Sequence, residues 1–322
     1  MIDDPVLVHD WHVVAHSEDV PEGGVRRARL LGEDLVLWRS GGMVYAWQDL
    51  CVHRGARLSL GRVTDGLLVC PYHGWTYDGT GRCVRIPAHP DQVPPARARV
   101  VTYRAVERYG WIWVCLGEPK HDVPPFPEWN DPAFRKVHCG PYPYEASGPR
   151  AVENFLDVAH FPYVHEGLLG DPRYPEIEDY EVETGPEGIV AKNIRVWQPD
   201  PDGTGRGAHV TYTYRVYRPL VAYFIKTSGG PAFSILFAVT PVEPARCIGW
   251  MILAMNYGFE VPAEQIRAFE DRIVSQDVPV VESQRPELLP LDLQAELHLR
   301  SDRTAIAYRK WLRELGLRFG TA

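Results

Sequence analysis

Alternating apolar and polar positions dominate the first third of the chain and predict β-strands there. The segment EDLVLWRSGGMVYAWQD holds two apolar runs around Gly41 and Gly42, a pattern typical of a β-hairpin. GLLVCPYHGWTYDGTGRCVRI repeats the pattern, with a glycine-rich turn near residues 78–81, and RYGWIWVCLGEP is a further strand. The proline-rich stretch HDVPPFPEWN then ends this region. We therefore expect an all-β domain over residues 1–120.

The rest of the chain, residues 121–322, shows a mixed pattern. PRAVENFLDVAHFPYVHEG has apolar residues at helical spacing, whereas residues 178–257 alternate again and are rich in β-branched and aromatic side chains. PAEQIRAFEDRIVSQDVPVVESQ reads as a long helix with a kink at Pro279, and TAIAYRKWLRELG as a C-terminal helix that ends at Gly316. These elements predict a second, α+β domain.

Composition narrows the class of protein. The chain has 322 residues, 45% of them hydrophobic, and a net charge of −8, which argues against nucleic acid as a partner. We expect no membrane segment, because the apolar runs are short, and a cytoplasmic location, because the start is acidic and only six cysteines are present. Residues 51–110 hold nine arginines against four acids, either a solvated face or a docking surface for an acidic redox partner.

Two cysteines and two histidines lie close together in the β-rich region. Cys51 and His53 form a C-x-H pair, and Cys70 and His73 form a C-x-x-H pair 16 residues later. Zinc accepts two thiolates and two imidazoles, but its motifs usually pair like ligands with like. Here each half supplies one thiolate and one imidazole, which favours a [2Fe–2S] centre with one iron on both cysteines and the other on both histidines.

A second group of candidate ligands lies in ENFLDVAHFPYVHEG. Asn154, Asp157 and His160 are spaced three apart and are expected to share one helical face. His165 is five residues beyond His160, too far round a straight helix, so we expect Pro162 to break the regular turn and let both imidazoles meet. Two histidines and one carboxylate form the facial triad typical of non-haem Fe(II) sites.

The third ligand is expected from the late helix. Three carboxylates are candidates, namely Asp271, Asp277 and Glu282. Asp277 lies two residues before the predicted kink, whereas Glu270 and Asp271 look like ordinary solvent-facing charges.

These motifs carry a family resemblance. C-x-H-R-G followed by C-P-Y-H-G-W resembles the Rieske domain of the Rieske non-haem iron oxygenases, and N-x-x-D-x-x-H-x4-H and SQDVPVVESQRPELLP are similar to their catalytic domain. The resemblance implies a [2Fe–2S] cluster on the four cysteine and histidine ligands of the first group. It implies Fe(II) on His160, His165 and Asp277. It gives Asp157 and Asn154 catalytic roles, with Asp157 conducting electrons from a cluster histidine, His73, of a neighbouring subunit.

The resemblance also implies an architecture and an activity. The expected fold is an N-terminal all-β Rieske domain followed by an α+β catalytic domain, whose antiparallel sheet is covered by helices in a helix-grip arrangement. The chain is similar to the compact homotrimeric branch, including phenylpropionate-dioxygenase-like proteins and hydroxylases of the saxitoxin pathway. Such a catalytic (alpha) subunit would be a mono- or dioxygenase that hydroxylates or oxidatively demethylates a small cyclic compound, using O2 and electrons from an NAD(P)H-dependent reductase or a ferredoxin.

Two alternatives remain open from the sequence. One is a Rieske electron carrier without oxygenase activity, in which the pair His160 and His165 would be incidental. The other is a zinc-binding protein without catalytic activity.

Overall fold

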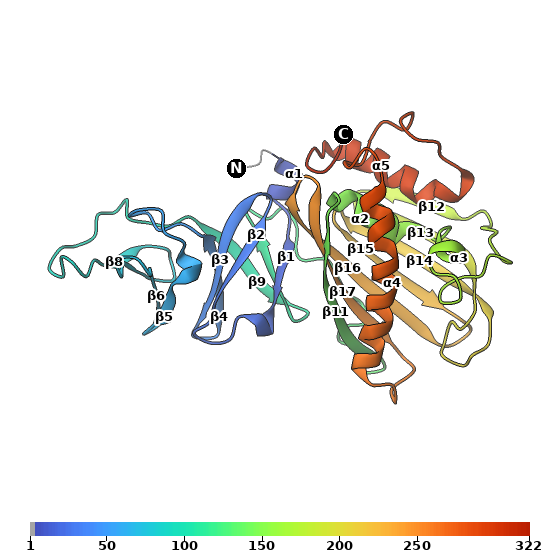
Figure 1. Cartoon of the computed structure of the whole chain (residues 1–322), viewed down its shortest axis with the longest axis horizontal. Helices are drawn as coiled ribbons and strands as arrows, with labels where there is room; N and C mark the ends of the chain where they lie inside the picture. Colours follow the sequence, from blue (N-terminus) through green and yellow to red (C-terminus); the bar gives the residue numbers. More distant parts are fainter. Residues whose placement is uncertain (1–3) are drawn as a thin grey trace. The chain divides into compact units, whose positions relative to one another are not determined.

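A computed structural model describes residues 4–322, and the chain divides into two compact units, Met1–Val123 and Pro124–Ala322. Figure 1 shows the first unit built from strands and the second from a large sheet with helices. The predicted fold class, an all-β domain followed by an α+β domain with an antiparallel sheet, is confirmed. No helix within residues 4–322 is both long and apolar enough to cross a membrane.

The first unit contains an antiparallel six-stranded sheet with the order β1-β10-β9-β4-β3-β2. The hairpin between β3 and β4 forms as predicted, because Gly41 and Gly42 adopt φ angles of 60° and 75°, which the tight turn requires. The short helix α1 (Pro5–Val8) precedes the sheet. The strands of the six-stranded sheet are β1 (His12–His16), β2 (Val25–Leu30), β3 (Glu33–Ser40), β4 (Met43–Gln48), β9 (Thr102–Arg108) and β10 (Trp111–Cys115).

A smaller four-stranded sheet follows β4 in the chain and supports the cysteine–histidine loops. Its order is β5-β6-β7-β8, and the loop between β6 and β7 contains Cys70 and His73. The core below this sheet is apolar, with Trp38 and Trp47 at most 1% exposed and Cys51 packed in the same cluster. The strands are β5 (Arg62–Thr64), β6 (Leu67–Val69), β7 (Thr76–Tyr77) and β8 (Cys83–Arg85).

The second unit is built on an antiparallel seven-stranded sheet with the order β11-β17-β16-β15-β14-β13-β12. Neighbours in the chain from β12 to β17 are neighbours in the sheet, and β11 closes the other edge against β17. The strands are β11 (Arg135–Tyr144), β12 (Glu181–Gly185), β13 (Gly188–Gln198), β14 (Ala208–Arg218), β15 (Val221–Thr227), β16 (Ala232–Glu243) and β17 (Arg246–Met255).

Helices cover one face of this sheet (Figure 1). The long helix α4 (Ala263–Ser283) packs against β11 and continues through Pro279. The C-terminal helix α5 (Arg303–Leu315) packs against β12 and β13 and ends, as predicted, at Gly316 in the left-handed conformation. Helix α2 (Gly148–Leu156) contacts the sheet and both other helices, so it holds the layer together.

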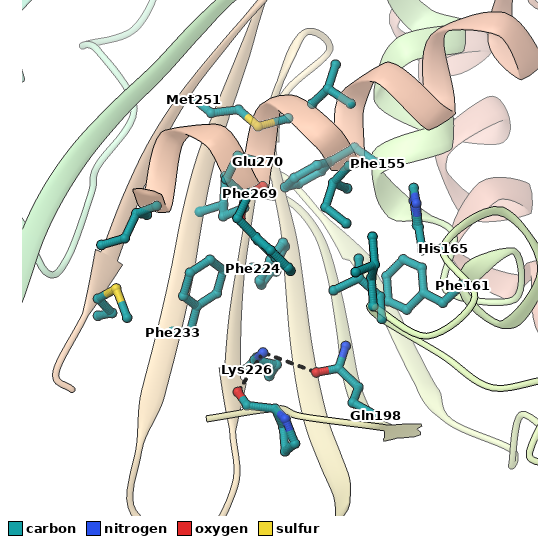
Figure 2. A pocket seen from close by; sticks show the side chains of 18 of the residues that line it. Phe155, Phe161, His165, Gln198, Phe224, Lys226, Phe233, Met251, Phe269 and Glu270 are labelled. Carbon is teal, nitrogen blue, oxygen red and sulfur yellow. Dashed lines mark hydrogen bonds between the residues drawn. The ribbon is translucent and has the colours of Figure 1, made fainter. Parts of the chain in front are cut away.

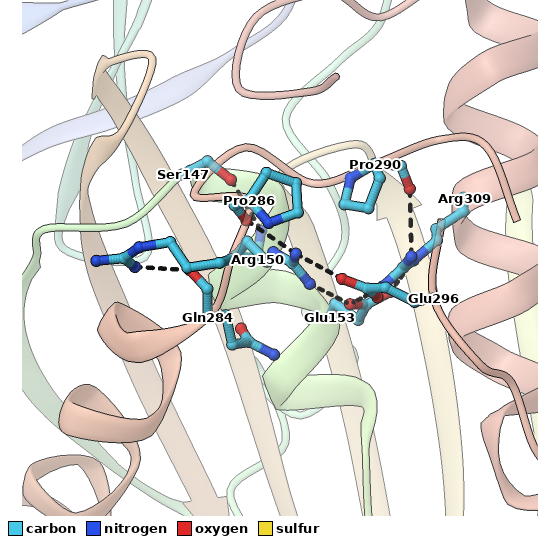
Figure 3. A network of polar contacts seen from close by, with 9 residues as sticks. Ser147, Arg150, Glu153, Gln284, Pro286, Pro290, Glu296 and Arg309 are labelled. Carbon is cyan, nitrogen blue, oxygen red and sulfur yellow. Dashed lines mark hydrogen bonds and ion pairs between the residues drawn. The ribbon is translucent and has the colours of Figure 1, made fainter. Parts of the chain in front are cut away.

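A buried network of four charged side chains fixes α2 to α5 (Figure 3). Arg309 on α5 donates to both carboxylate oxygens of Glu153 on α2, over 2.6 and 2.7 Å, and also to Glu296. Arg150 on α2 donates to the other oxygen of Glu296, over 2.7 Å, and to the carbonyl of Pro286. Both guanidinium groups are almost fully buried, so the network fixes the orientation of α2 and of the residues that follow it.

Candidate metal centres

The two cysteine–histidine loops have the same backbone hydrogen bonds. The amide of Cys51 donates to the carbonyl of Ala56, and the amide of Gly55 donates back to Cys51. In the second loop Cys70 takes the place of Cys51, with the carbonyl of Trp75 and the amide of Gly74 as its partners. Gly55 and Gly74 both have φ near 70°, so each closes its loop in a conformation that L side chains disfavour. The loops thus present two cysteines in equivalent settings.

The two thiols of this group are buried, whereas its two imidazoles are more exposed. Cys51 and Cys70 are each 2% exposed, and the Cys51 sulfur lies 3.1 Å from the Tyr77 hydroxyl. His53 is half-buried and His73 is exposed, and their rings meet edge to face at 4.5 Å. Both thiols therefore lie in the apolar core while the imidazoles lie near the surface.

The chemistry of this group fits a metal cluster. His53 Nδ1 is buried and has no hydrogen-bond partner among residues 4–322, which suits a nitrogen that ligates a metal. Trp75 stacks on the His53 ring, with the two ring centroids 4.5 Å apart, and shields it. Within the described residues, these four side chains do not form a group with the close spacing of a single ion.

The second group converges on a single point. His160 and His165 approach each other with their Nε2 atoms 3.2 Å apart, and Asp277 Oδ1 lies 3.4 Å from the first and 3.1 Å from the second. Ligands at about 2.1 Å from one ion lie about 3.0 Å apart at right angles and about 3.4 Å apart at tetrahedral angles. The three atoms therefore form a triangle of the size that one ion can bridge, and they leave its other side open.

Each ligand candidate is held by a further side chain. Asp157 Oδ2 lies 3.2 Å from His160 Nδ1, and Gln276 Oε1 lies 2.9 Å from His165 Nδ1. Asn154 on α2 donates to Asp277 Oδ1 over 3.4 Å. Such partners fix the tautomer and direction of a ligating imidazole. The sequence did not single out Gln276, whose only signal is its position directly before Asp277.

The electrostatics of this group favour positive charge at its centre. Burial alone would lower the pKa of His160, but hydrogen bonds to Asp157 and Asp277 outweigh it and raise that pKa to about 9. Burial alone would raise the pKa of Asp277, but hydrogen bonds from His160 and His165 lower it to about 2. A bound cation would stabilise the Asp277 carboxylate in place of the protons on the two imidazoles.

The local path of the chain differs from the prediction. Helix α2 ends at Leu156, so Asn154, Asp157 and His160 do not share a helical face. Asp157 is extended, with ψ of 133°, and its Oδ1 accepts from the amide of Ala159 over 2.7 Å, a side-chain bond that replaces the next helical turn. The prediction that one helix carries all three residues is therefore wrong, although Asp157 still contacts His160.

A separate one-turn helix, α3 (Phe161–Val164), positions both histidines. His160 is its N-cap and His165 its C-cap. Pro162 occupies the first turn, where proline is favoured, so it begins this helix rather than breaking an earlier one. The backbone of α3 packs directly on Gly170, where a Cβ atom would lie 2.5 Å from the Pro162 nitrogen.

The other predicted carboxylates have different surroundings. Asp271 accepts a hydrogen bond from the Tyr142 hydroxyl over 2.7 Å, and Glu282 accepts from the amide of Glu145 over 2.8 Å. Neither belongs to the group around His160. The expectation that Glu270 faces solvent is wrong, because it is 6% exposed and lines a cavity.

A cavity of about 480 Å³ opens onto the three converging side chains. Figure 2 shows its walls, formed by aromatic side chains of the sheet, of α4 and of the segment around α3. The aromatic residues include Phe155, Phe161, Phe224, Phe233, Phe237 and Phe269. Tyr212, Tyr214 and Met255 also line it.

The two units thus combine a thiolate–imidazole site with a two-histidine, one-carboxylate site over a large apolar cavity, the arrangement of an iron-dependent redox enzyme. The chain matches the Rieske [2Fe-2S] domain over residues 10–104 and the vanillate O-demethylase oxygenase C-terminal domain over residues 144–318. Methylxanthine N1-demethylase NdmA of Pseudomonas putida is 34% identical over 96% of this chain and 89% of that protein.

Solved structures agree with these matches. NdmA of Pseudomonas putida with caffeine superposes with a TM-score of 0.81, at 32% identity, over 96% of this chain and 91% of that one. Dicamba monooxygenase with non-haem iron and dicamba superposes with a TM-score of 0.73, at 25% identity, over 96% and 97%. The chain belongs to the Rieske non-haem iron oxygenases, as a catalytic (alpha) subunit. The predicted family, enzyme class and cofactors, a [2Fe–2S] cluster and iron, are confirmed.

Proposed function

We propose that this oxygenase acts as a monooxygenase that removes a methyl group from the nitrogen of a small cyclic substrate. The observation that carries the proposal is the triangle of His160, His165 and Asp277 at the wall of a 480 Å³ aromatic cavity. The N-demethylase NdmA, similar over nearly the whole chain, supports the choice of bond. The reaction would consume O2, two electrons and two protons, hydroxylate the methyl carbon, and release water, formaldehyde and the demethylated amine.

In this proposal, Cys51, His53, Cys70 and His73 hold the cluster, and His160, His165 and Asp277 hold the iron. When bound, the two groups supply single-electron transfer and activation of O2. The chain's own side chains do the positioning. Gln276 and Asp157 orient the two imidazoles, and Asn154 orients Asp277. The aromatic walls of the cavity exclude water and hold the substrate ring against the open side of the triangle.

The electron supply involves other chains. Asp157 lines a second cavity of about 210 Å³, bordered by two exposed apolar side chains, Val280 and Leu297, of which Leu297 is 90% exposed. We propose that a neighbouring subunit of a homotrimer docks there, with its His73 facing Asp157. A flavin-containing NAD(P)H-dependent reductase or a ferredoxin would dock on the arginine-rich face of residues 51–110. Six free, buried cysteines suit a cytosolic setting.

The test starts with metal content. We expect about three irons and two sulfides per chain in protein purified without oxygen. His160→Ala should keep about two irons and both sulfides, with an unchanged cluster spectrum, but release no formaldehyde from N-methylated ring compounds supplied with a surrogate reductase. Zinc without sulfide, or normal formaldehyde release by the variant, would refute the proposal.

A second variant separates electron delivery from metal binding. Asp157→Ala removes the carboxylate between the proposed subunit interface and His160 but leaves the three ligand side chains intact. With Fe(II) added in excess, we expect about three irons per chain and about a hundredfold loss of formaldehyde release. Normal turnover would exclude a path through Asp157.

A further inference from the structure

A lysine lies inside the cavity without an acidic partner. Lys226 on β15 is 8% exposed, and its ammonium group donates to Gln198 Oε1 and to the Pro201 carbonyl, each over 3.1 Å (Figure 2). Among residues 4–322, no carboxylate lies within 4 Å of it. Burial lowers its pKa to about 8, although the charge of Glu270 opposes this. Since an ammonium has three protons and two are engaged, one donor remains for a ligand.

A carboxyl group without a hydrogen-bond partner lies on the opposite wall. Glu270 on α4 is 6% exposed and lines the same cavity, and no hydrogen bond reaches it from the residues that the structure describes. Burial raises its pKa to about 7, with the charge of Lys226 opposing. Because Glu270 lines the cavity and accepts no hydrogen bond from the described residues, a ligand bound there can supply its partner.

The position of Glu270 along α4 fits the length of a ring system. Glu270 and Asp277 are seven residues apart, which places them on the same face of the helix and about 10 Å apart along its axis. The side chains of Ile273 and Val274 line the cavity between them. A bicyclic ring with one substituent spans this distance, so its far edge would reach Glu270 while the substituent lies at the triangle of ligands.

From these contacts we propose that Lys226 and Glu270 determine substrate specificity by binding a neutral heterocyclic amide, with a ring carbonyl toward Lys226 and a ring N–H toward Glu270. Lys226 donates its free proton to the carbonyl, and Glu270 accepts from the N–H. The aromatic side chains hold the ring between them. This inference rests on the proposed function, since it assigns the substrate class to the same cavity.

The charges around the cavity disfavour the main alternative, an aromatic carboxylate bound to Lys226. Glu270 faces the same space, and three further acidic residues, Asp200, Asp202 and Glu260, also line the cavity. An anion in this cavity would lie among these four acidic groups and meet a single ammonium that already donates twice to neutral acceptors. A neutral ligand with one acceptor and one donor satisfies both buried groups at once.

The test measures binding, so it does not depend on turnover. Iron-loaded protein is titrated by calorimetry, without oxygen or reductant, with 2-quinolone, with N-methyl-2-quinolone, which lacks the N–H donor, and with 2-naphthoate, an anion of similar size. We expect 2-quinolone to bind at least about tenfold more tightly than either other probe. Tighter binding of 2-naphthoate, equal binding of all three, or no measurable binding of 2-quinolone would overturn the inference.

Variants assign the preference to the two residues. Glu270→Met should abolish the preference for 2-quinolone over its N-methyl analogue, and Lys226→Met should weaken binding of both about tenfold. Glu264→Met, on an exposed part of α4, and Lys192→Met, on β13 at the surface, are the controls and should change neither ratio. Glu270→Gln, which keeps an acceptor oxygen, should retain part of the preference and guards against misfolding of the methionine variant.

The two proposals fail in distinguishable ways. If the quinolones are not discriminated but formaldehyde release depends on His160, only the substrate class is wrong. If the quinolones bind as expected but His160→Ala keeps full activity, the proposed reaction is wrong and the recognition of a cyclic amide stands.

Discussion

Replacing Arg309 by methionine should destabilise the second unit strongly. The substitution keeps most of the apolar stem and removes the guanidinium that donates to Glu153 and Glu296. Glu153 is 9% exposed, so it would be left as a buried carboxylate with a weaker partner, Arg150, at 3.6 Å. Breaking a buried ion pair from one side costs about 3–5 kcal/mol. Because Arg150 still neutralises part of the charge, we expect about 3 kcal/mol.

The assay is thermal and urea unfolding, followed by circular dichroism. A loss of about 3 kcal/mol should lower the melting temperature of the second unit by about 6–12 °C. Lys310→Met is the matched control, because Lys310 is the next residue of α5 and is exposed; its effect should stay within about 0.5 kcal/mol. Formaldehyde release at low temperature should fall as well, because α2 leads directly into Asp157.

The double variant Arg309→Met/Glu153→Met gives the decisive comparison. Removing both partners leaves no unpaired carboxylate on α2, so at least half of the lost stability should return. The reasoning would be refuted if the losses of unfolding free energy in the two single variants simply added in the double variant. It would also be refuted if Arg309→Met alone lost less than about 1 kcal/mol. Either result would show that solvent reaches Glu153 far more than its burial indicates.

Two further predictions concern single side chains. Gln276→Leu removes the acceptor for His165 Nδ1 and should weaken iron binding about 10–100-fold, measured as iron retained against a chelator, with sulfide content unchanged; unaltered retention would contradict it. Burial lowers the pKa of His12 to about 4, so the folded chain keeps it neutral while the unfolded chain protonates it below pH 6.5. The unfolding free energy of the first unit should therefore fall by up to about 3 kcal/mol between pH 6.5 and 4. In urea titrations at several pH values, His12→Gln should make this pH dependence weaker. Equal pH dependence in the variant and the wild type would argue against a lowered pKa of His12.

The sequence predicted the elements whose causes are local. Strand alternation and the glycine pair Gly41–Gly42 determine the first hairpin, and the left-handed Gly316 ends α5. The motif spacing identified His160 and His165, and the family resemblance added Asp277; the structure brings these three side chains together. Periodicity failed where a side chain competes with the backbone, as at Asp157, whose carboxylate replaces the next turn of α2.

Residues that matter through tertiary contacts could not be found from the sequence. Glu270 follows the pattern of a solvent-facing helix position, and only the sheet below α4 makes it buried. Lys226 lies in an apolar strand with no motif around it, and its partners Gln198 and Pro201 come from residues more than twenty positions earlier. Gln276 carries no signal until the fold places it against His165.

The way α3 carries both histidines limits how this enzyme can be altered. A helix of four residues is too short to be stable alone, so its shape depends on the surface beneath it, where Gly170 leaves no room for a side chain. Residues 157–170 therefore act as one structural unit, in which an insertion of a single residue would misplace both imidazoles together. Laboratory evolution of new substrate ranges should leave this segment unchanged and introduce its mutations on the strands that face the cavity.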